Sequence, residues 1–263
     1  MAVTAGMTTP RVLILRSPGT NCNEEAAHAF ALAGAECEQL HIGALLESPE
    51  RLQAFQVFCL PGGFSYGDDI AAGRILGNQV RLRLADACRA FRDQGKLVLG
   101  ICNGFQVLMK TGLLDIDDDQ GPAATLTRND CGHFEARWVD LSVTAGPCVF
   151  LAGVEQMSLP VAHAEGKFVT RDPAALQRLA DAGRLVLRYR NDTSNSPAGY
   201  PANPNGSEGD VAGICDSTGR VLGLMPHPER FVDATQHPAW TRRDRKTAAD
   251  GLRVFENAVA YFR

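Results

Sequence analysis

The sequence lacks any apolar run of the roughly 20 residues that a membrane-spanning helix needs. Its first ten residues contain no basic segment that leads into an apolar one, so we expect neither a secretory signal nor a membrane anchor. It also lacks an excess of basic charge, because 26 Lys and Arg stand against 30 Asp and Glu, for a net charge of −4. Nucleic acids and anionic membranes need basic surfaces, so we expect neither as a partner.

Paired cysteines are also absent. The eight cysteines are scattered and form no C-x-x-C pair, which in a chain of 263 residues indicates reduced thiols and a cytoplasmic location. Cys131 and His133 form one short Cys/His pair, but no second pair at zinc spacing follows, so we expect no metal site. No G-x-x-x-x-G-K-[ST] phosphate loop occurs, so any ATP chemistry must lie on another chain.

Apolar residues are plentiful, at 45%, and they fall in an alternating pattern of strands and helices. Short apolar runs predict buried strands at residues 11–16, 57–60 and 97–101. A further strand fits residues 36–42, and helical segments lie between the strands. This order predicts an α/β fold with a central, mostly parallel sheet flanked by helices. In such sheets ligands bind at the carboxyl ends of the strands.

Later segments predict a smaller antiparallel portion and further helices. Residues 211–215 and 221–225 flank a turn and predict a hairpin. Asp172 is expected to cap a helix over 173–182, and Asn21 or Asn23 to cap the first helix. Other predictions are one helix whose buried face carries Val80, Leu84, Cys88 and Phe91, strands at 134–143, 157–162 and 185–189, and a long surface loop over 191–210.

Residues 97–108 are the most informative stretch. A buried strand runs into Gly100, then Cys102, then Gly104 and an amphipathic helix. Strand, sharp turn and helix form the layout of a nucleophile elbow, where a helix N-terminus favours a thiolate. Free cysteine is also one of the most buried residue types, so from this stretch alone a core cysteine is an equal alternative.

The loop after the third strand contains Pro61, Gly62 and Gly63. It leaves a neighbouring strand at the same edge as Cys102, and its bare amides can face a ligand. A tetrahedral intermediate needs two such donors, which here would be the amides of Gly63 and Asn103. An ordinary tight turn is the alternative interpretation of the glycine pair.

Residues 226–229 place His227 between two prolines, followed by Glu229. Residues two apart in an extended segment share a face, so the carboxylate can fix the tautomer of the imidazole. A loop histidine with a structural hydrogen bond is the alternative. Together, Cys102, His227, Glu229 and the two amides predict thiol-based acyl transfer through a thioester.

Six motifs occur in the order found in one known family. They are residues 18–23 (PGTNCN), 61–68 (PGGFSYGD), 100–106 (GICNGFQ), 160–166 (PVAHAEG), 203–207 (NPNGS) and 225–230 (MPHPER). On these motifs the chain resembles the class I glutamine amidotransferases, and among them the glutaminase subunits of phosphoribosylformylglycinamidine synthases in purine biosynthesis. The resemblance implies the flavodoxin-like fold of that class over residues 11–263, as one domain after an extension at 1–10.

The resemblance also implies the chemistry and the site. Glutamine would be hydrolysed by a triad of Cys102, His227 and Glu229, and ammonia would pass to a large ATP- and magnesium-dependent synthetase. The chain itself would need no cofactor and no metal. The amides of Gly63 and Asn103 would hold the oxyanion beside Gly62, Gln106 would contact the amino-acid end of glutamine, and His163 would help to wall the pocket.

Two segments depart from the compact members of this family. Residues 191–210 look like an inserted surface loop, and residues 237–250 carry an extra basic cluster of Arg242, Arg243, Arg245 and Lys246. They leave open the docking mode and the need for a small accessory subunit. The alternatives are an amidotransferase or cysteine hydrolase of another pathway, and a sensor that uses Cys102 as a redox or ligand switch. We expect weak glutaminase activity from the isolated chain.

Overall fold

The computed structural model describes residues 9–191, 197–242 and 249–263. The predicted extension at 1–10 therefore lies outside the described residues except for Thr9 and Pro10, and so do Arg243, Arg245 and Lys246 of the basic cluster. Within the described part of the chain, no helix combines the length and the apolar character needed to cross a membrane.

Nine strands form one mixed sheet in the order β2-β1-β3-β4-β11-β10-β9-β6-β7. The pairs from β2 to β11 are parallel, and those from β11 to β7 are antiparallel. A separate antiparallel pair joins β5 to β8. The strands are β1 Arg11–Arg16, β2 Glu36–His41, β3 Val57–Leu60, β4 Leu97–Ile101, β5 Ala124–Thr127, β6 Glu135–Val143, β7 Gln156–His163, β8 Lys167–Thr170, β9 Leu187–Tyr189, β10 Val211–Cys215 and β11 Val221–Leu224.

The predicted α/β fold with a parallel core and an antiparallel portion is confirmed. The four parallel strands that lead to the site, β1, β3, β4 and β11, are apolar and almost wholly buried, which is why the sequence displays them as unbroken apolar runs. Their carboxyl ends meet at one edge of the sheet. The loops that follow them there are therefore neighbours in space, although they are far apart in the sequence.

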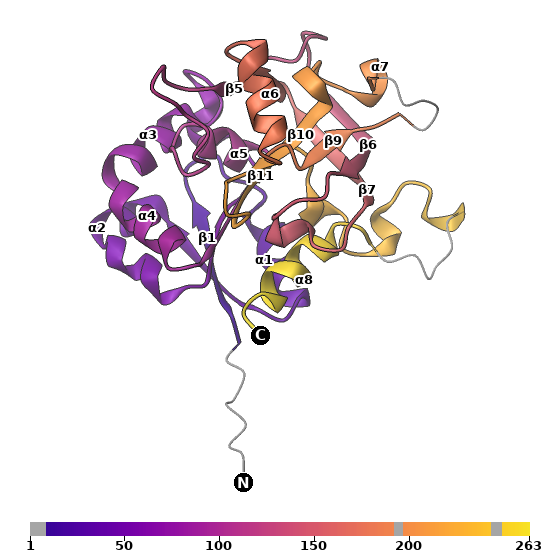
Figure 1. Ribbon diagram of the computed structural model, residues 1–263. Coiled ribbons are helices and arrows are strands. Elements are labelled where there is room, and N and C mark those ends of the chain that lie inside the picture. The colour runs from indigo at the N-terminus through magenta and orange to yellow at the C-terminus, as the bar shows by residue number, and fades with distance from the viewer. Residues whose placement is uncertain (1–8, 192–196, 243–248) are drawn as a thin grey trace.

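Helices cover both faces of the parallel strands (Figure 1). On one face α1 packs against α8, where Phe30 and Phe255 meet edge to face with ring centroids 4.8 Å apart. On the other face lie α3, α4 and α5. The helices are α1 Asn23–Leu32, α2 Ile42–Glu47, α3 Arg74–Arg83, α4 Ala85–Asp93, α5 Asn103–Leu108, α6 Pro173–Asp181, α7 Gly199–Ala202 and α8 Leu252–Ala260.

Two helix predictions were wrong in detail. Neither Asn21 nor Asn23 caps α1, because Cys22 occupies the N-cap position and makes no side-chain cap bond. The single helix predicted through residue 84 is two helices, α3 and α4, which meet where Leu84 leaves helical geometry at φ −119°. The shared buried face was correct, because Val80, Leu84, Cys88 and Phe91 are all at most 1% exposed. The spacing of these four residues along the chain thus places them on one buried face, although the helix is interrupted between them.

The segment over 191–210, predicted as a surface loop, is partly buried. Residues 192–196 lie outside the described part, but the second half packs into the protein. Asn203, Asn205 and Ser207 are buried, and the Asn205 amide donates to the carbonyl of Gly166 and to the hydroxyl of Tyr189. This half lies against β8 and β9, because the side-chain amide of Asn205 donates to the backbone carbonyl before β8 and to the tyrosine hydroxyl of β9.

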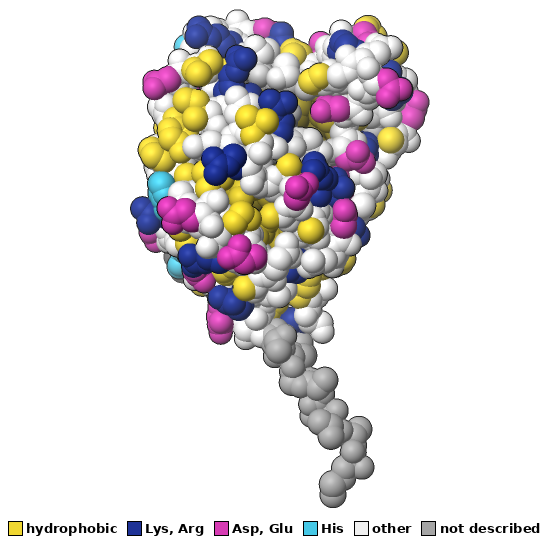
Figure 2. All heavy atoms as spheres, turned by 90° about the vertical axis from the view of Figure 1, so that its left-hand side faces the viewer, with side chains coloured by type: hydrophobic (Ala, Val, Ile, Leu, Met, Phe, Trp, Pro, Cys, Tyr) yellow, Lys and Arg dark blue, Asp and Glu magenta, His cyan; other side chains and the backbone are white. Residues whose placement is uncertain are grey.

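Acidic and basic side chains are mixed over the face that carries α2, α3 and α4 (Figure 2). No single-sign basic area dominates that face.

Candidate functional site

Cys102 lies at a sharp turn between β4 and α5. Its backbone has φ 50° and ψ −105°, a conformation that L-residues rarely adopt. The Cys102 amide still donates to the carbonyl of Leu224, so the turn begins directly at the end of the β4–β11 pair. Strain of this kind, held by a rigid sheet on one side and a helix on the other, is typical of a nucleophile elbow.

The two glycines around Cys102 are required by close packing. A Cβ at Gly104 would lie 1.8 Å from the carbonyl oxygen of Leu60 in β3, and a Cβ at Gly100 would lie 2.7 Å from the carbonyl oxygen of Gly104. Real Cβ atoms do not approach backbone oxygens that closely. The glycines thus let α5 lie directly against β3 and β4, which fixes where Cys102 points.

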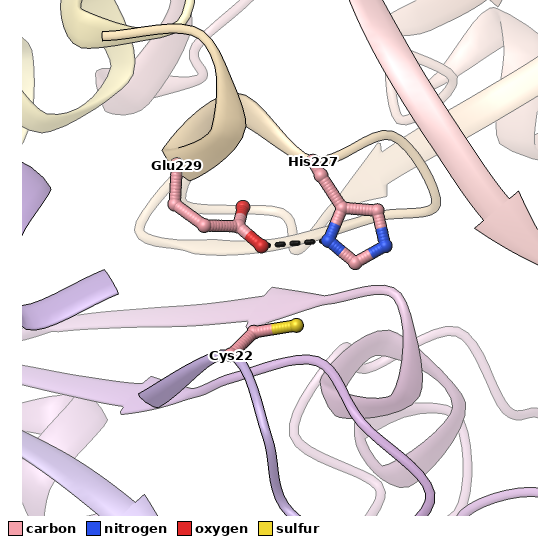
Figure 3. Close-up of side chains that lie close together, drawn as sticks. All are labelled: Cys22, His227 and Glu229. Carbon is pink, nitrogen blue, oxygen red and sulfur yellow. Dashed lines mark hydrogen bonds and ion pairs between the residues drawn. The ribbon is translucent and has the colours of Figure 1, made fainter. Parts of the chain in front are cut away.

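His227 and Glu229 follow β11, the strand beside β4. The Nδ1 atom of His227 lies 2.6 Å from Oε1 of Glu229, and both residues are about 2% exposed. Figure 3 shows the carboxylate of Glu229 pointing at the imidazole from one side. Since a carboxylate accepts, Nδ1 carries the proton, and Nε2 makes no hydrogen bond with a described residue. That nitrogen is free to exchange a proton with a substrate or a thiol.

The electrostatics favour a charged imidazole. Burial disfavours the charge of His227, but the carboxylate of Glu229 and the thiols of Cys102 and Cys22 raise its pKa well above the ordinary 6.5. A raised imidazole pKa beside a thiol stabilises a thiolate–imidazolium pair. The pair combines a nucleophile with an acid that can protonate a leaving group.

Cys102 and His227 line the same cavity, which has a volume of about 80 Å³. Its other lining residues come from five separate segments and are Asn21, Cys22, Gly63, Phe64, Phe134, Ala162 and Arg230. The Sγ atom of Cys102 lies 3.6 Å from the carbonyl oxygen of Ala162. The nucleophile and the imidazole expected from the sequence are therefore brought together.

The expected oxyanion donors lie beside this cavity. Gly63 lines it, and its φ of 143° is a backbone conformation that favours glycine. Among the described residues, neither the Gly63 amide nor the Asn103 amide donates a hydrogen bond to the backbone or to a side chain. Asn103 opens α5, where the first amides of a helix have no partner in the helix. Both groups thus remain available to an oxyanion.

Gly62 lies against the imidazole. A Cβ there would be 2.9 Å from Cε1 of His227 and 3.0 Å from Sγ of Cys22. The Gly62 carbonyl also accepts from the amide of Cys22 at 3.2 Å. Glycine at this position therefore allows the loop after β3, the loop after β1 and His227 to close on one another.

Gln106 and His163 are placed differently from the other expected residues. Gln106 Nε2 donates to the carbonyl of Glu165 at 2.6 Å, and its Oε1 accepts from the side chain of Asn103 at 2.8 Å, so its amide ties α5 to the segment after β7. His163 is 3% exposed, and its Nδ1 faces Asn129 at 3.2 Å. Neither lines the cavity, and their contact with substrate stays a prediction.

Cys22 and Arg230 are site residues that the sequence reasoning did not assign. Arg230 Nη2 lies 3.1 Å from Sγ of Cys22, and Figure 3 shows that thiol directed toward the space beneath the imidazole of His227. Both belonged to motifs that were noted without a role. The topology could have identified Cys22, because the loop after β1 must lie beside the loop after β3 at the same edge of the sheet.

Comparison with known proteins gives a consistent picture. Residues 9–262 match the family described as CobB/CobQ-like glutamine amidotransferase domain. The chain is 47% identical over 258 residues to the phosphoribosylformylglycinamidine synthase subunit PurQ of Dehalococcoides mccartyi, covering 98% of this chain and 99% of that one. It is 38% identical to the same subunit of Methanococcus maripaludis, covering 96% and 97% of the two chains.

Among solved structures, a chain of PurLQS from Thermotoga maritima superposes with a TM-score of 0.73 at 31% identity, covering 97% of this chain and 100% of that chain. The glutaminase domain of a Trypanosoma brucei CTPS with bound acivicin superposes with a TM-score of 0.55 at 13% identity, covering 96% and 94%. At that identity the second likeness concerns the fold alone.

Proposed function

Because this chain belongs to the CobB/CobQ-like glutamine amidotransferase family, we propose that its site hydrolyses glutamine and delivers ammonia. The chain is the glutaminase subunit of a phosphoribosylformylglycinamidine synthase and serves purine biosynthesis, as its full-length similarity to PurQ subunits supports. It works within a complex of the PurLQS kind, with PurL and PurS as partners. The observation that carries the site assignment is that Cys102 and His227 share one buried cavity.

In the reaction, the Cys102 thiolate attacks the side-chain amide carbon of glutamine. The amides of Gly63 and Asn103 hold the oxygen that becomes negative, and the His227 imidazolium, held by Glu229, protonates the departing nitrogen. Ammonia leaves and a thioester to Cys102 remains. His227 then takes a proton from a water molecule that attacks the thioester, and glutamate leaves as the thiol re-forms.

Gly62 leaves space for the imidazole of His227. Gln106 positions the part of the site that binds substrate, through its contact with the segment that includes His163. In this arrangement Gln106 acts through its bonds to Asn103 and to the carbonyl of Glu165. His163 supports the wall from β7. Residues 11–263 act as one amidotransferase domain, because strands from both halves of the chain join in one continuous sheet.

The size of the cavity supports low activity of the isolated chain. About 80 Å³ is far below the several hundred Å³ of a typical small-molecule pocket. Opening of the wall by the synthetase would couple glutamine use to synthesis and prevent wasteful hydrolysis.

Glutamine hydrolysis by these residues needs no cofactor on this chain, and ATP with magnesium acts on the synthetase partner. The cytoplasm is the proposed location, because all eight cysteines are free thiols.

The test replaces each of the two cavity thiols in turn. In the reconstituted complex, Cys102→Ala should lower glutamine-dependent synthesis by at least about 10⁴-fold, since the nucleophile is gone, while ammonia-dependent synthesis is retained. Cys22→Ala is the matched control and should keep far more glutamine use than Cys102→Ala. Retained glutamine use in the Cys102 variant together with its loss in the Cys22 variant would overturn the assignment.

A further inference from the structure

Cys131, His133 and Glu135 form a second cluster of metal-ligand side chains, outside the catalytic triad. One ligand atom from each lies within 4.8 Å of those from the other two. The segment runs from the turn at Gly132, with φ 72°, into the start of β6. The turn at Gly132 folds the chain back before β6 begins, so the three side chains are brought together by local geometry. The sequence showed only the first two of them as a pair.

The orientation of His133 suits a metal ligand. Its Nδ1 lies 2.9 Å from the carbonyl oxygen of Cys131, and because a carbonyl only accepts, Nδ1 carries the proton. Its Nε2 lies 3.1 Å from Oε1 of Glu135, an ion pair when the ring is protonated, and a bound metal ion would take the place of the proton between these two atoms. Donation of the other ring N–H to a carbonyl is the usual support of a metal-bound histidine.

The carboxylate of Glu135 is buried, and each of its oxygens faces a basic side chain. The residue is 2% exposed, Oε2 is paired with Arg137, and Oε1 faces His133. With zinc–nitrogen and zinc–oxygen bonds of about 2.0–2.2 Å, two ligands of a tetrahedral ion lie about 3.4 Å apart. The 3.1 Å between Nε2 of His133 and Oε1 of Glu135 is close to that separation.

A pocket of about 530 Å³ opens beside the cluster. Cys131 and His133 line it on one side, and Tyr200 and Asn205 line it on the other. A bound ion would therefore have protein ligands on one side and an open position toward this pocket, which a water molecule can fill. Thiolate, imidazole and carboxylate together are a ligand set that zinc and cobalt accept.

We propose that Cys131, His133 and Glu135 bind a divalent transition-metal ion of the zinc class at the rim of the catalytic cavity. Phe134, between two of the ligands, lines that cavity. A bound ion fixes the segment that presents Phe134. The other Cys/His/Glu cluster in the described residues is Cys22 with His227 and Glu229. It belongs to the catalytic site, where Nδ1 of His227 is already bonded to Glu229.

The test is a titration of the full chain with Co²⁺, followed by displacement with Zn²⁺. A Cys22→Ser background removes the thiol of the catalytic cluster, so a cobalt–thiolate absorption band reports Cys131. We expect one Co²⁺ per chain, loss of the band in Cys131→Ser, and an affinity at least about tenfold weaker in His133→Ala. Circular dichroism checks that each variant is folded.

Two matched controls separate this site from chance binding. Cys37, half-buried like Cys131, is replaced by Ser, and the exposed His28 by Ala; both variants should keep the band and the affinity. Absence of a band in the background protein, or a band that survives Cys131→Ser, would overturn the proposal. In that case the three residues form only an ion-paired network with Arg137. The readout is metal binding, so the result does not depend on the glutaminase assignment.

Discussion

The two halves of the sheet contribute differently to the site. The parallel half, β2 to β11, carries the proposed nucleophile, the two proposed oxyanion amides, the imidazole and its carboxylate on loops at one edge. The antiparallel half, β10 to β7, supplies walls through Phe134 before β6 and Ala162 in β7. The proposed reacting groups thus come from loops after the parallel strands. The walls come from the antiparallel half, where packing joins residues that are far apart in the sequence. With this division, a partner protein can change the walls of the cavity without displacing the residues that react.

After that of Cys102→Ala, the largest effect is expected within the parallel half, from Glu229→Gln. The amide no longer holds the charged imidazole of His227, so glutamine-dependent turnover in the complex should fall about 10³- to 10⁴-fold, measured as kcat for glutamine. Glu25→Gln is the control. It removes a carboxylate 3.6 Å from Arg230 that does not touch His227, and a partly exposed ion pair contributes little. Equal losses in the two variants would place the effect outside the triad.

A second expected effect concerns how the parallel half holds the elbow. Gly104→Ala places a methyl group on the carbonyl of Leu60, so backbone must move. We expect a loss of at least about 3 kcal/mol in the free energy of unfolding by urea. Gly146→Ala, whose nearest neighbour atom would be 3.4 Å away, should change it by less than about 1 kcal/mol. A tolerated Gly104→Ala would show that α5 is not held directly against β3.

The third effect lies in the antiparallel half and depends on pH. Burial, followed by the charge of His227, lowers the pKa of His163 from 6.5 to about 4. Between these values the unfolded chain binds more protons than the folded one, so stability is lost as pH falls from about 6.5 to about 4. The gap corresponds to about 3 kcal/mol.

Urea unfolding across that pH range measures this loss, and the matched variant is His163→Gln, which cannot titrate. Its stability should depend less steeply on pH than that of the parent chain. Equal slopes in the two proteins would mean that His163 does not carry the loss.

The same two halves explain what the sequence could predict. In the parallel half β1, β3, β4 and β11 are buried apolar runs, and the turns that follow need glycine or proline for local reasons, so short patterns were enough to predict Cys102, Gly63 and His227 as site residues. Cys22 was not assigned, because its approach to Arg230 depends on the contact between the loop after β1 and the segment after β11. In the antiparallel half the burial of Asn205 was missed, since polar composition predicts a surface loop, yet its amide finds partners on Gly166 and Tyr189.

The central claim is that the thiol of residue 102, rather than its neighbour at 22, forms the covalent bond with glutamine. It is tested most directly by treating the assembled complex with a chloroketone analogue of glutamine and mapping the modified peptide by mass spectrometry. We predict one adduct per chain, on the peptide that contains Cys102, and protection by excess glutamine. An adduct on Cys22, or full loss of glutamine use with Cys102 unmodified, would contradict the account.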